Sequence, residues 1–165
     1  MGKVAVDTLE LENILSDIRS KERTIVTTNG VFDILHVGHV RSLQFAKSLG
    51  DILIVGINSD CSARRYKGDT RPFIPQSERA ELLAALSCVD YVTIFDDPTP
   101  ERLLEIIQPN VHVKGGDYNS DTLPEAKIVQ KYGGRLEFIP YLPGHSTTDI
   151  ITRIVASARE KDCEL

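Results

Sequence analysis

The sequence predicts a single doubly wound α/β domain, in which helices cover both faces of a five-stranded parallel sheet. Two observations favour this fold. Short β-branched or apolar segments alternate with helical patterns along the chain, which is typical of βαβ units with right-handed crossovers. Several of these segments are apolar without alternation, as expected for strands buried on both faces. The 165 residues suffice for one such domain, which we assign to 1–165.

The first predicted element is a helix over about 8–20, which follows a cap at Asp7 and repeats apolar residues at helical spacing. The five predicted strands then cover 24–28, 51–57, 90–95, 111–113 and 135–139.

Helical patterns separate the strands. They cover 38–49, 76–87, 100–108 and 124–132, and a last helix covers about 148–161. Gly50 and Gly133 follow two of these helices, as residues with access to positive φ commonly do, and Thr99 with Pro100 marks the start of a third. Irregular structure is expected over 68–75 and 140–147.

Composition excludes several classes of protein. The formal net charge of −5 argues against a nucleic-acid partner or a polybasic membrane surface, because both need a basic footprint. No apolar segment is long enough to span a bilayer and no targeting segment opens the chain, so we expect no membrane partner. The three cysteines include no Cys-x-x-Cys pair, which suits a reducing compartment. A cytoplasmic location is expected.

The most informative segment is Thr28-Asn29-Gly30-Val31-Phe32-Asp33-Ile34-Leu35-His36-Val37-Gly38-His39. It joins the first strand to a helix that begins near Gly38, so free backbone N–H groups and the positive end of the helix dipole point to one place. His36 and His39 are three residues apart and lie on one side of this helix. Gly38 between them allows an anion to approach the backbone. We predict a phosphate site.

A second anion site is predicted at Ser146, Thr147 and Thr148, which precede the last helix. One hydroxyl there is explained by helix capping, but three are not. In doubly wound sheets, ligands bind at the carboxyl ends of the strands where the strand order reverses. The first strand leads to His36 and the fourth to Lys114-Gly115-Gly116-Asp117, so both segments should face one cleft.

These residues resemble those of a known family. The segment Asn29 to His39, together with Ser146-Thr147-Thr148, resembles the nucleotidylyltransferases with a His-x-Gly-His signature and a Ser-Thr-Ser/Thr signature, over about 23–154. Further segments resemble the adenylyltransferase domain of ADP-heptose synthases. They are Asn58-Ser59-Asp60, Lys67-Gly68, Arg71-Pro72 and Lys114-Gly115-Gly116-Asp117-Tyr118.

The resemblance implies transfer of AMP from ATP to D-glycero-β-D-manno-heptose 1-phosphate, which gives ADP-heptose for lipopolysaccharide or another surface polysaccharide, and pyrophosphate. The anomer stays open. A separate sugar kinase is expected to supply the acceptor, and the resembling enzymes are commonly oligomeric, so a homo-oligomer is possible. Magnesium is implied as the companion of ATP, whose phosphates supply most of its ligands. No His or Cys spacing indicates a zinc site, and no protein metal ligands are predicted.

In nucleotidyl transfer the acceptor phosphate attacks the α-phosphorus in line, and the protein mainly positions two anions and stabilises developing charge. We predict three residues for this catalytic work: His36, His39 and Lys67. We predict eleven residues that bind the nucleotide or its phosphates: Asn29, Gly30, Phe32, Gly38, Arg79, Lys114, Gly115, Asp117, Ser146, Thr147 and Thr148. We predict three that bind the acceptor: Asp33, Asn58 and Arg71.

Several assignments have alternatives. Arg79 opposes the dipole of its helix, which favours a nearby anion, but a salt bridge to Glu78 or another carboxylate would also explain it. Arg64 and Arg65 fit either the site or a solvated helix face. The roles of His145 and Arg153 stay open. His112 lies within a strand, where packing is expected.

Other functions compete with this prediction. A cytidylyltransferase for glycerol 3-phosphate or a similar phosphoalcohol is the main alternative, since the residues do not reveal base preference. A non-catalytic nucleotide-binding module is the alternative from another class. A class I aminoacyl-tRNA synthetase fragment is disfavoured by the acidic balance, and a dehydrogenase or P-loop kinase by the lack of their glycine motifs.

Overall fold

The computed structural model describes residues 2–5, 8–115, 123–139 and 144–162. Its centre is a parallel sheet in the order β1-β4-β3-β2-β5-β6. The strands are β1 (Lys3–Ala5), β2 (Ile25–Gly30), β3 (Ile52–Asn58), β4 (Tyr91–Phe95), β5 (Val111–Gly115) and β6 (Arg135–Ile139). The predicted α/β class is confirmed, with six strands in place of five.

The additional strand, β1, pairs with β4 at one edge of the sheet. With three residues it is too short for a hydrophobic period, so the sequence pattern could not indicate it. The five predicted strands are all present, and β2 and β5 each extend two residues beyond their predicted ends. This extension brings Asn29, Gly30, Lys114 and Gly115 into the sheet at its carboxyl edge.

Seven helices are described: α1 (Thr8–Ser20), α2 (Val37–Lys47), α3 (Asp60–Lys67), α4 (Gln76–Ala84), α5 (Glu101–Ile107), α6 (Pro124–Lys131) and α7 (Thr147–Asp162). Helix α3 was not predicted, because only Ser62 and Ala63 of its eight residues are buried and no apolar repeat marks it. Ser59 caps it by accepting a hydrogen bond from the Ser62 backbone N–H.

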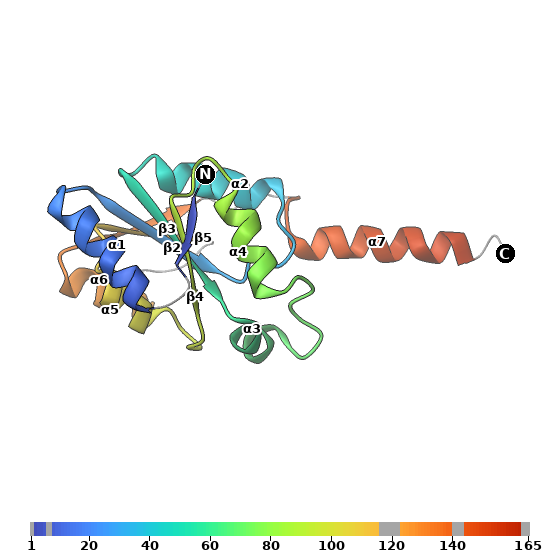
Figure 1. Ribbon diagram of the computed structural model, residues 1–165. Helices are drawn as coiled ribbons and strands as arrows, with labels where there is room; N and C mark the ends of the chain where they lie inside the picture. Colours follow the sequence, from blue (N-terminus) through green and yellow to red (C-terminus); the bar gives the residue numbers. More distant parts are fainter. Residues whose placement is uncertain (1, 6–7, 116–122, 140–143, 163–165) are drawn as a thin grey trace.

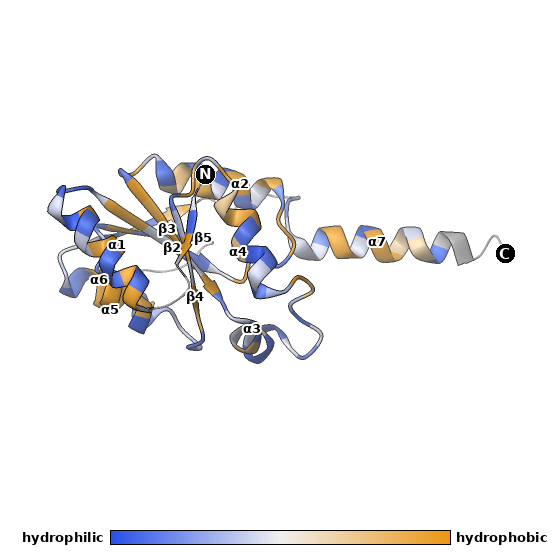
Figure 2. Ribbon diagram, in the orientation of Figure 1, coloured by the Kyte–Doolittle hydropathy of each residue, from blue (hydrophilic) through white to orange (hydrophobic). Residues whose placement is uncertain are grey.

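The helices cover the two faces of the sheet (Figure 1). On one face, α2 and α4 bury Leu43, Ala46, Ala80 and Leu83 against apolar side chains of the strands. On the other, α1 and α5 form a second apolar cluster, and α6 packs beside α5. Figure 2 shows that the strands between these layers are largely hydrophobic, which accounts for their non-alternating sequence pattern.

Helix α7 extends away from this body (Figure 1), and Ile154 on it is 60% exposed. Only its first turn lies near the carboxyl edge of the sheet, where Thr147 and Thr148 line a cavity. Among the helices that the structure describes, none combines the length and apolar character needed to cross a membrane.

Candidate functional site

Two adjoining cavities, here called the larger and the smaller lobe, lie at the carboxyl edge of the sheet, where the strand order reverses between β2 and β5. The larger lobe has a volume of about 500 Å³, and the smaller lobe about 250 Å³. Both are lined by Val31, Phe32, His39 and Lys67, so these four residues mark where the lobes meet. The predicted cleft is therefore present at the predicted edge.

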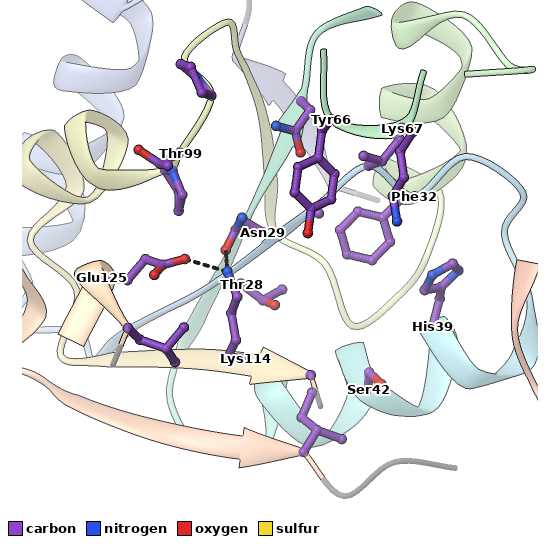
Figure 3. A pocket seen from close by; sticks show the side chains of 18 residues that line it. Thr28, Asn29, Phe32, His39, Ser42, Tyr66, Lys67, Thr99, Lys114 and Glu125 are labelled. Atoms are coloured by element: carbon purple, nitrogen blue, oxygen red, sulfur yellow. Dashed lines mark hydrogen bonds and ion pairs between the residues drawn. The ribbon is translucent and has the colours of Figure 1, made fainter. Parts of the chain in front are cut away.

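Residues from several elements line the larger lobe (Figure 3). They include Thr28, Asn29, Gly30, Ser42, Asn58, Tyr66, Pro98, Thr99, Pro100, Lys114, Gly115, Leu123, Glu125 and Ile139. The smaller lobe adds Asp33, Arg71, Thr147 and Thr148. The first turn of α7 thus faces the same space as the loop after β2, as the two predicted anion sites require.

His36 and His39 stack on each other, with ring centroids 3.8 Å apart and planes inclined by 23°. The His39 ring also contacts Phe32, at a centroid distance of 5.1 Å. His36 precedes the first residue of α2 but does not line either lobe, whereas His39 lines both. The Nδ1 atoms of both rings are buried without a hydrogen-bond partner in the described structure. The stacked pair thus has hydrogen-bonding capacity that no described residue uses.

The pKa of each imidazole lies below its ordinary value. Burial, followed by the neighbouring His36, lowers the pKa of His39 to about 4. Burial and His145 lower the pKa of His36, while Asp149 opposes them. An anion beside the rings would favour the charged form and raise both pKa values. In the protein alone, His39 is therefore a neutral hydrogen-bonding group beside an anion cleft.

Gly38 is closely packed in this structure, and its contact with an anion stays a prediction. A Cβ at residue 38 would lie 3.0 Å from His36 Nδ1 and 3.1 Å from the carbonyl oxygen of His145. The missing side chain thus makes room for the His36 ring and for the segment before α7. Gly38 acts by packing the two predicted anion sites together.

Lys67 is the last residue of α3, and Gly68 follows it with φ of 93°. The predicted irregular stretch begins at this glycine, and the lysine belongs to the helix before it. Its ammonium lies 5.1 Å from the centre of the Tyr66 ring. Exposed and present in both lobes, Lys67 is placed to contact an anion where the lobes meet.

The predicted role of Arg79 in phosphate binding is wrong. This side chain is 1% exposed and lines neither lobe. Its guanidinium donates to the carbonyls of Ile74 (2.9 Å), Val31 (2.5 Å) and Asn58 (2.9 Å) and to Asp60 Oδ1 (2.7 Å). The salt-bridge alternative holds, but the carboxylate belongs to Asp60 and not to Glu78. Arg79 thus joins the backbone segments at Val31, Asn58 and Ile74 by hydrogen bonds on the side away from the cleft.

Asp33 and Arg71 form a salt bridge of 2.7 Å in the smaller lobe. Asp33 Oδ1 also accepts hydrogen bonds from the backbone N–H groups of Phe73 (2.7 Å) and Ile74 (3.1 Å). The carboxylate therefore shapes the 71–74 loop, and its direct contact with a substrate stays a prediction. Asn58 lines the larger lobe, and its amide donates to Ser62 Oγ at 3.0 Å.

Lys114 lies in the floor of the larger lobe (Figure 3). Its ammonium is 2.5 Å from Glu125 Oε1 and 3.4 Å from Asn29 Oδ1. Among the described residues, no atom lies within 4 Å of a Cβ added at Gly115. The structure brings Asn29, Lys114 and Gly115 together as predicted. Asp117 lies outside the described residues, and its role stays a prediction.

The three hydroxyl residues at the start of α7 have different roles. Ser146 Oγ accepts a hydrogen bond from the Asp149 backbone N–H (3.0 Å), and Asp149 Oδ2 accepts one from the Ser146 backbone N–H (3.1 Å), which is a capping box. Ser146 lines neither lobe, so its predicted phosphate contact is not supported by this arrangement. Thr147 and Thr148 line the smaller lobe beside Arg71.

Residues with open assignments lie mostly away from the cleft. Arg64 and Arg65 are exposed on α3 and line neither lobe. Arg153 is likewise exposed, and its Nε donates to the Asp149 carbonyl at 3.4 Å. His112 is buried, as predicted, with Nδ1 2.8 Å from Thr27 Oγ1. Burial and the charge of Lys114 lower the pKa of His112 to about 4.

Sequence reasoning missed Ser42, Tyr66, Thr99 and Glu125 as lining residues. Ser42, one turn after His39 on α2, could have been found from helical spacing. Tyr66 and Glu125 depend on where α3 and α6 dock on the sheet, which no local pattern encodes. Within the described ranges, no three His, Cys, Asp or Glu side chains cluster as metal ligands.

Comparison with known proteins supplies independent information. A family model described as cytidylyltransferase-like matches residues 27–153. The bifunctional protein HldE of Syntrophotalea carbinolica is 52% identical over 145 residues, which cover 88% of this chain and 30% of that protein. The bifunctional protein HldE of Geobacter metallireducens is 50% identical over 151 residues, or 92% of this chain and 31% of that protein. The chain thus spans about 30% of the length of these relatives.

Two solved structures are also similar. The lipopolysaccharide core biosynthesis protein from Thermoplasma volcanium has a TM-score of 0.58 and 28% sequence identity, with 73% of this chain and 97% of that chain covered. The pantoate-beta-alanine ligase from Francisella tularensis has a TM-score of 0.62 and 16% identity, with 87% of this chain and 69% of that chain covered. The second likeness shows a shared fold.

Proposed function

This chain belongs to the cytidylyltransferase-like family, and on that premise we propose that it is an adenylyltransferase that transfers AMP from ATP to D-glycero-D-manno-heptose 1-phosphate. The products would be ADP-heptose and pyrophosphate. Support comes from the two HldE relatives at about half identity and from the similar lipopolysaccharide core biosynthesis protein. The sequence resemblance over 58–60, 67–68, 71–72 and 114–118 points to the same subgroup.

The observation that carries this proposal is the pair of lobes that meet at His39 and Lys67. Nucleotidyl transfer needs the attacking and leaving oxygens on opposite sides of the α-phosphorus. A phosphate oxygen of the acceptor forms the new bond to this phosphorus, and the bond to the oxygen that bridges the α- and β-phosphates breaks. The electron pair leaves with pyrophosphate. The two lobes, which adjoin the ammonium of Lys67, suit this in-line arrangement of attacking and leaving oxygens.

The smaller lobe has the chemistry of a pyrophosphate site. Arg71 and Lys67 supply cationic donors, and Thr147 and Thr148 stand at the positive end of a 16-residue helix. His39, neutral until an anion arrives, would donate a hydrogen bond at the reacting phosphate. The acceptor phosphate is already ionised at neutral pH, so the proposed step needs no general base.

Magnesium is proposed to enter with ATP. Asp33 is the one carboxylate among the described residues that line the smaller lobe, and Arg71 and two backbone N–H groups already occupy it. These residues fit a metal held chiefly by the triphosphate, which neutralises the leaving pyrophosphate. Because the acceptor is a phosphorylated sugar, a sugar kinase activity must supply it, in another domain or another protein. ATP as donor and the free Cys61 and Cys88 fit the expected cytoplasmic location.

A pyrophosphate-release panel tests the proposal. ATP, CTP and GTP would each be paired with both anomers of heptose 1-phosphate and with glycerol 3-phosphate, in the presence of Mg²⁺. We expect turnover with ATP and a heptose 1-phosphate. Preference for CTP with glycerol 3-phosphate would replace the substrates and keep the reaction type. ATP binding without pyrophosphate release from any pair would indicate a non-catalytic module.

A further inference from the structure

Glu125 is a carboxylate inside a cleft built for anions. It is 5% exposed, and among the described residues that line the larger lobe it is the one acidic side chain. Burial alone would raise the pKa of Glu125, but the hydrogen bond and charge of Lys114 bring it below its ordinary value. An ionised carboxylate has no proton to donate to a phosphate oxygen, and it accepts hydrogen bonds instead. Its position therefore calls for a ligand group that donates hydrogen bonds.

The surroundings of Glu125 differ from the rest of the cleft. Figure 3 shows Thr99 and Glu125 on one side of Lys114, with His39 and Lys67 on the other. The salt bridge neutralises the charge of Lys114, and the walls beyond it include Pro98, Pro100 and Leu123. The described side chains at this end of the larger lobe combine hydrogen-bonding groups with apolar surface, and their charges cancel. Such a lining suits the hydroxyl-bearing part of a sugar better than a phosphate.

Lys114 fixes the direction of the carboxylate. Its ammonium bonds Oε1 of Glu125 at 2.5 Å and is itself held near Asn29 Oδ1. His112 is buried and bonds Thr27, and burial together with the charge of Lys114 lowers the pKa of His112 to about 4, so Glu125 is the group that carries the charge opposite to that of Lys114. A carboxylate oriented in this way accepts hydrogen bonds in fixed directions, which is the basis of discrimination among hydroxyl arrangements.

In-line geometry favours the acceptor sugar, over the ribose of the nucleotide, at the end of the larger lobe that contains Glu125. If pyrophosphate leaves into the smaller lobe, the attacking oxygen must arrive from the opposite side of the junction at His39 and Lys67. That side is the larger lobe. We therefore propose that Glu125, oriented by Lys114, is a specificity-determining residue that binds hydroxyl groups of the acceptor sugar. This inference rests on the proposed nucleotidyl-transfer function and adds a residue that its motifs do not contain.

The test is Glu125→Gln, which keeps the shape of the side chain and removes its charge. Steady-state pyrophosphate release would be measured with ATP and acceptor each varied in turn. We expect the KM for the acceptor to rise about 10- to 100-fold, because hydrogen bonds to a charged group are lost. The KM for ATP should change by less than about twofold. A merely structural role for Glu125 would not separate the two constants.

The matched control is Glu105→Gln. Glu105 also pairs with a lysine, Lys131, at 3.7 Å, but on the exposed surface away from both lobes. This variant should leave both KM values unchanged. If Glu125→Gln raises the KM for ATP instead, the carboxylate reads the ribose or base of the nucleotide and the inference is overturned. Unchanged constants would overturn it as well.

A second arm does not depend on the stability of the variant. Acceptors that each lack one ring hydroxyl would be compared on the wild-type protein, and at least one should bind about 10-fold more weakly than the parent sugar phosphate. With that analogue, Glu125→Gln should cause little further loss. Equal binding of every analogue would refute the assignment. Failure of the proposed function would be recognised separately, because the wild-type protein would then release no pyrophosphate in the panel of nucleotides and acceptors. The best acceptor from that panel is used in both arms of this test.

Discussion

Replacement of Arg79 by methionine should lower the free energy of unfolding by about 3–5 kcal/mol. Methionine keeps much of the aliphatic volume but leaves three backbone carbonyls, those of Val31, Asn58 and Ile74, without the donor they have now. Each buried acceptor left unpaired costs about 1–3 kcal/mol. The carboxylate of Asp60 also loses its partner, although it is 27% exposed and water can replace part of that interaction.

Urea unfolding followed by far-ultraviolet circular dichroism measures this change. With a denaturant slope of about 2 kcal/mol per molar, a loss of 4 kcal/mol shifts the midpoint by about 2 M. The unfolding midpoint of Arg79→Lys should lie between those of wild type and Arg79→Met, because one ammonium cannot replace all four hydrogen bonds of the guanidinium. Arg64→Met on exposed α3 is the control and should stay within about 0.5 kcal/mol of wild type. A stable Arg79→Met protein with a selectively raised KM for ATP would refute the structural role and restore the anion contact.

Three further predictions concern the site and its pH dependence. His39→Ala should fold normally and turn over at least about 100-fold more slowly, because a donor at the reacting phosphate is lost; near-normal single-turnover rates would contradict this. Ser146→Ala should destabilise α7 by about 1 kcal/mol, seen as faster amide hydrogen exchange in its first turn, while Thr147→Val should raise the KM for ATP; the reverse pattern would contradict the division of roles. His112 has a pKa of about 4 when folded and 6.5 as its ordinary value, so the unfolded chain binds more protons between these values and stability falls as pH decreases. At pH 5 this difference in proton binding lowers the free energy of unfolding by about 2 kcal/mol. Between pH 7.5 and 5, His112→Asn should therefore lose about 2 kcal/mol less unfolding free energy than wild type, as measured by urea titrations. Equal losses in the two proteins would show that other groups are responsible.

The fold was predictable because its signals are local. Each apolar strand carries its own pattern, and helix ends such as Gly133, with φ of 79°, carry theirs. The elements that the sequence did not reveal lack such signals. Strand β1 has three residues and is stabilised by pairing with β4. Helix α3 is stabilised by its cap at Ser59 and by Arg79 of α4, which donates a hydrogen bond to Asp60.

The site was predictable in part for the same reason. His39, Asn29 and Lys114 follow from the strand ends and the motif around them, and the structure gathers them in one cleft. The errors arose where the geometry of a single side chain decides the role. Arg79 points into the protein, and the sequence carries no sign of that direction. Glu125 was missed because its importance depends on Lys114, which is eleven residues away in the chain.

The contact at Gly38 links two segments more than a hundred residues apart. The space of its absent side chain is shared by the His36 ring and by the backbone at His145, at 3.0 and 3.1 Å. A methyl group there would be in tight contact with both, so the His36 ring or the backbone at His145 would have to move by a few tenths of an ångström. Transplanting the His-x-Gly-His segment into another strand–helix junction would therefore leave out the segment at His145 that packs against its glycine. A designer would have to graft the distant chain that rests on this glycine as well.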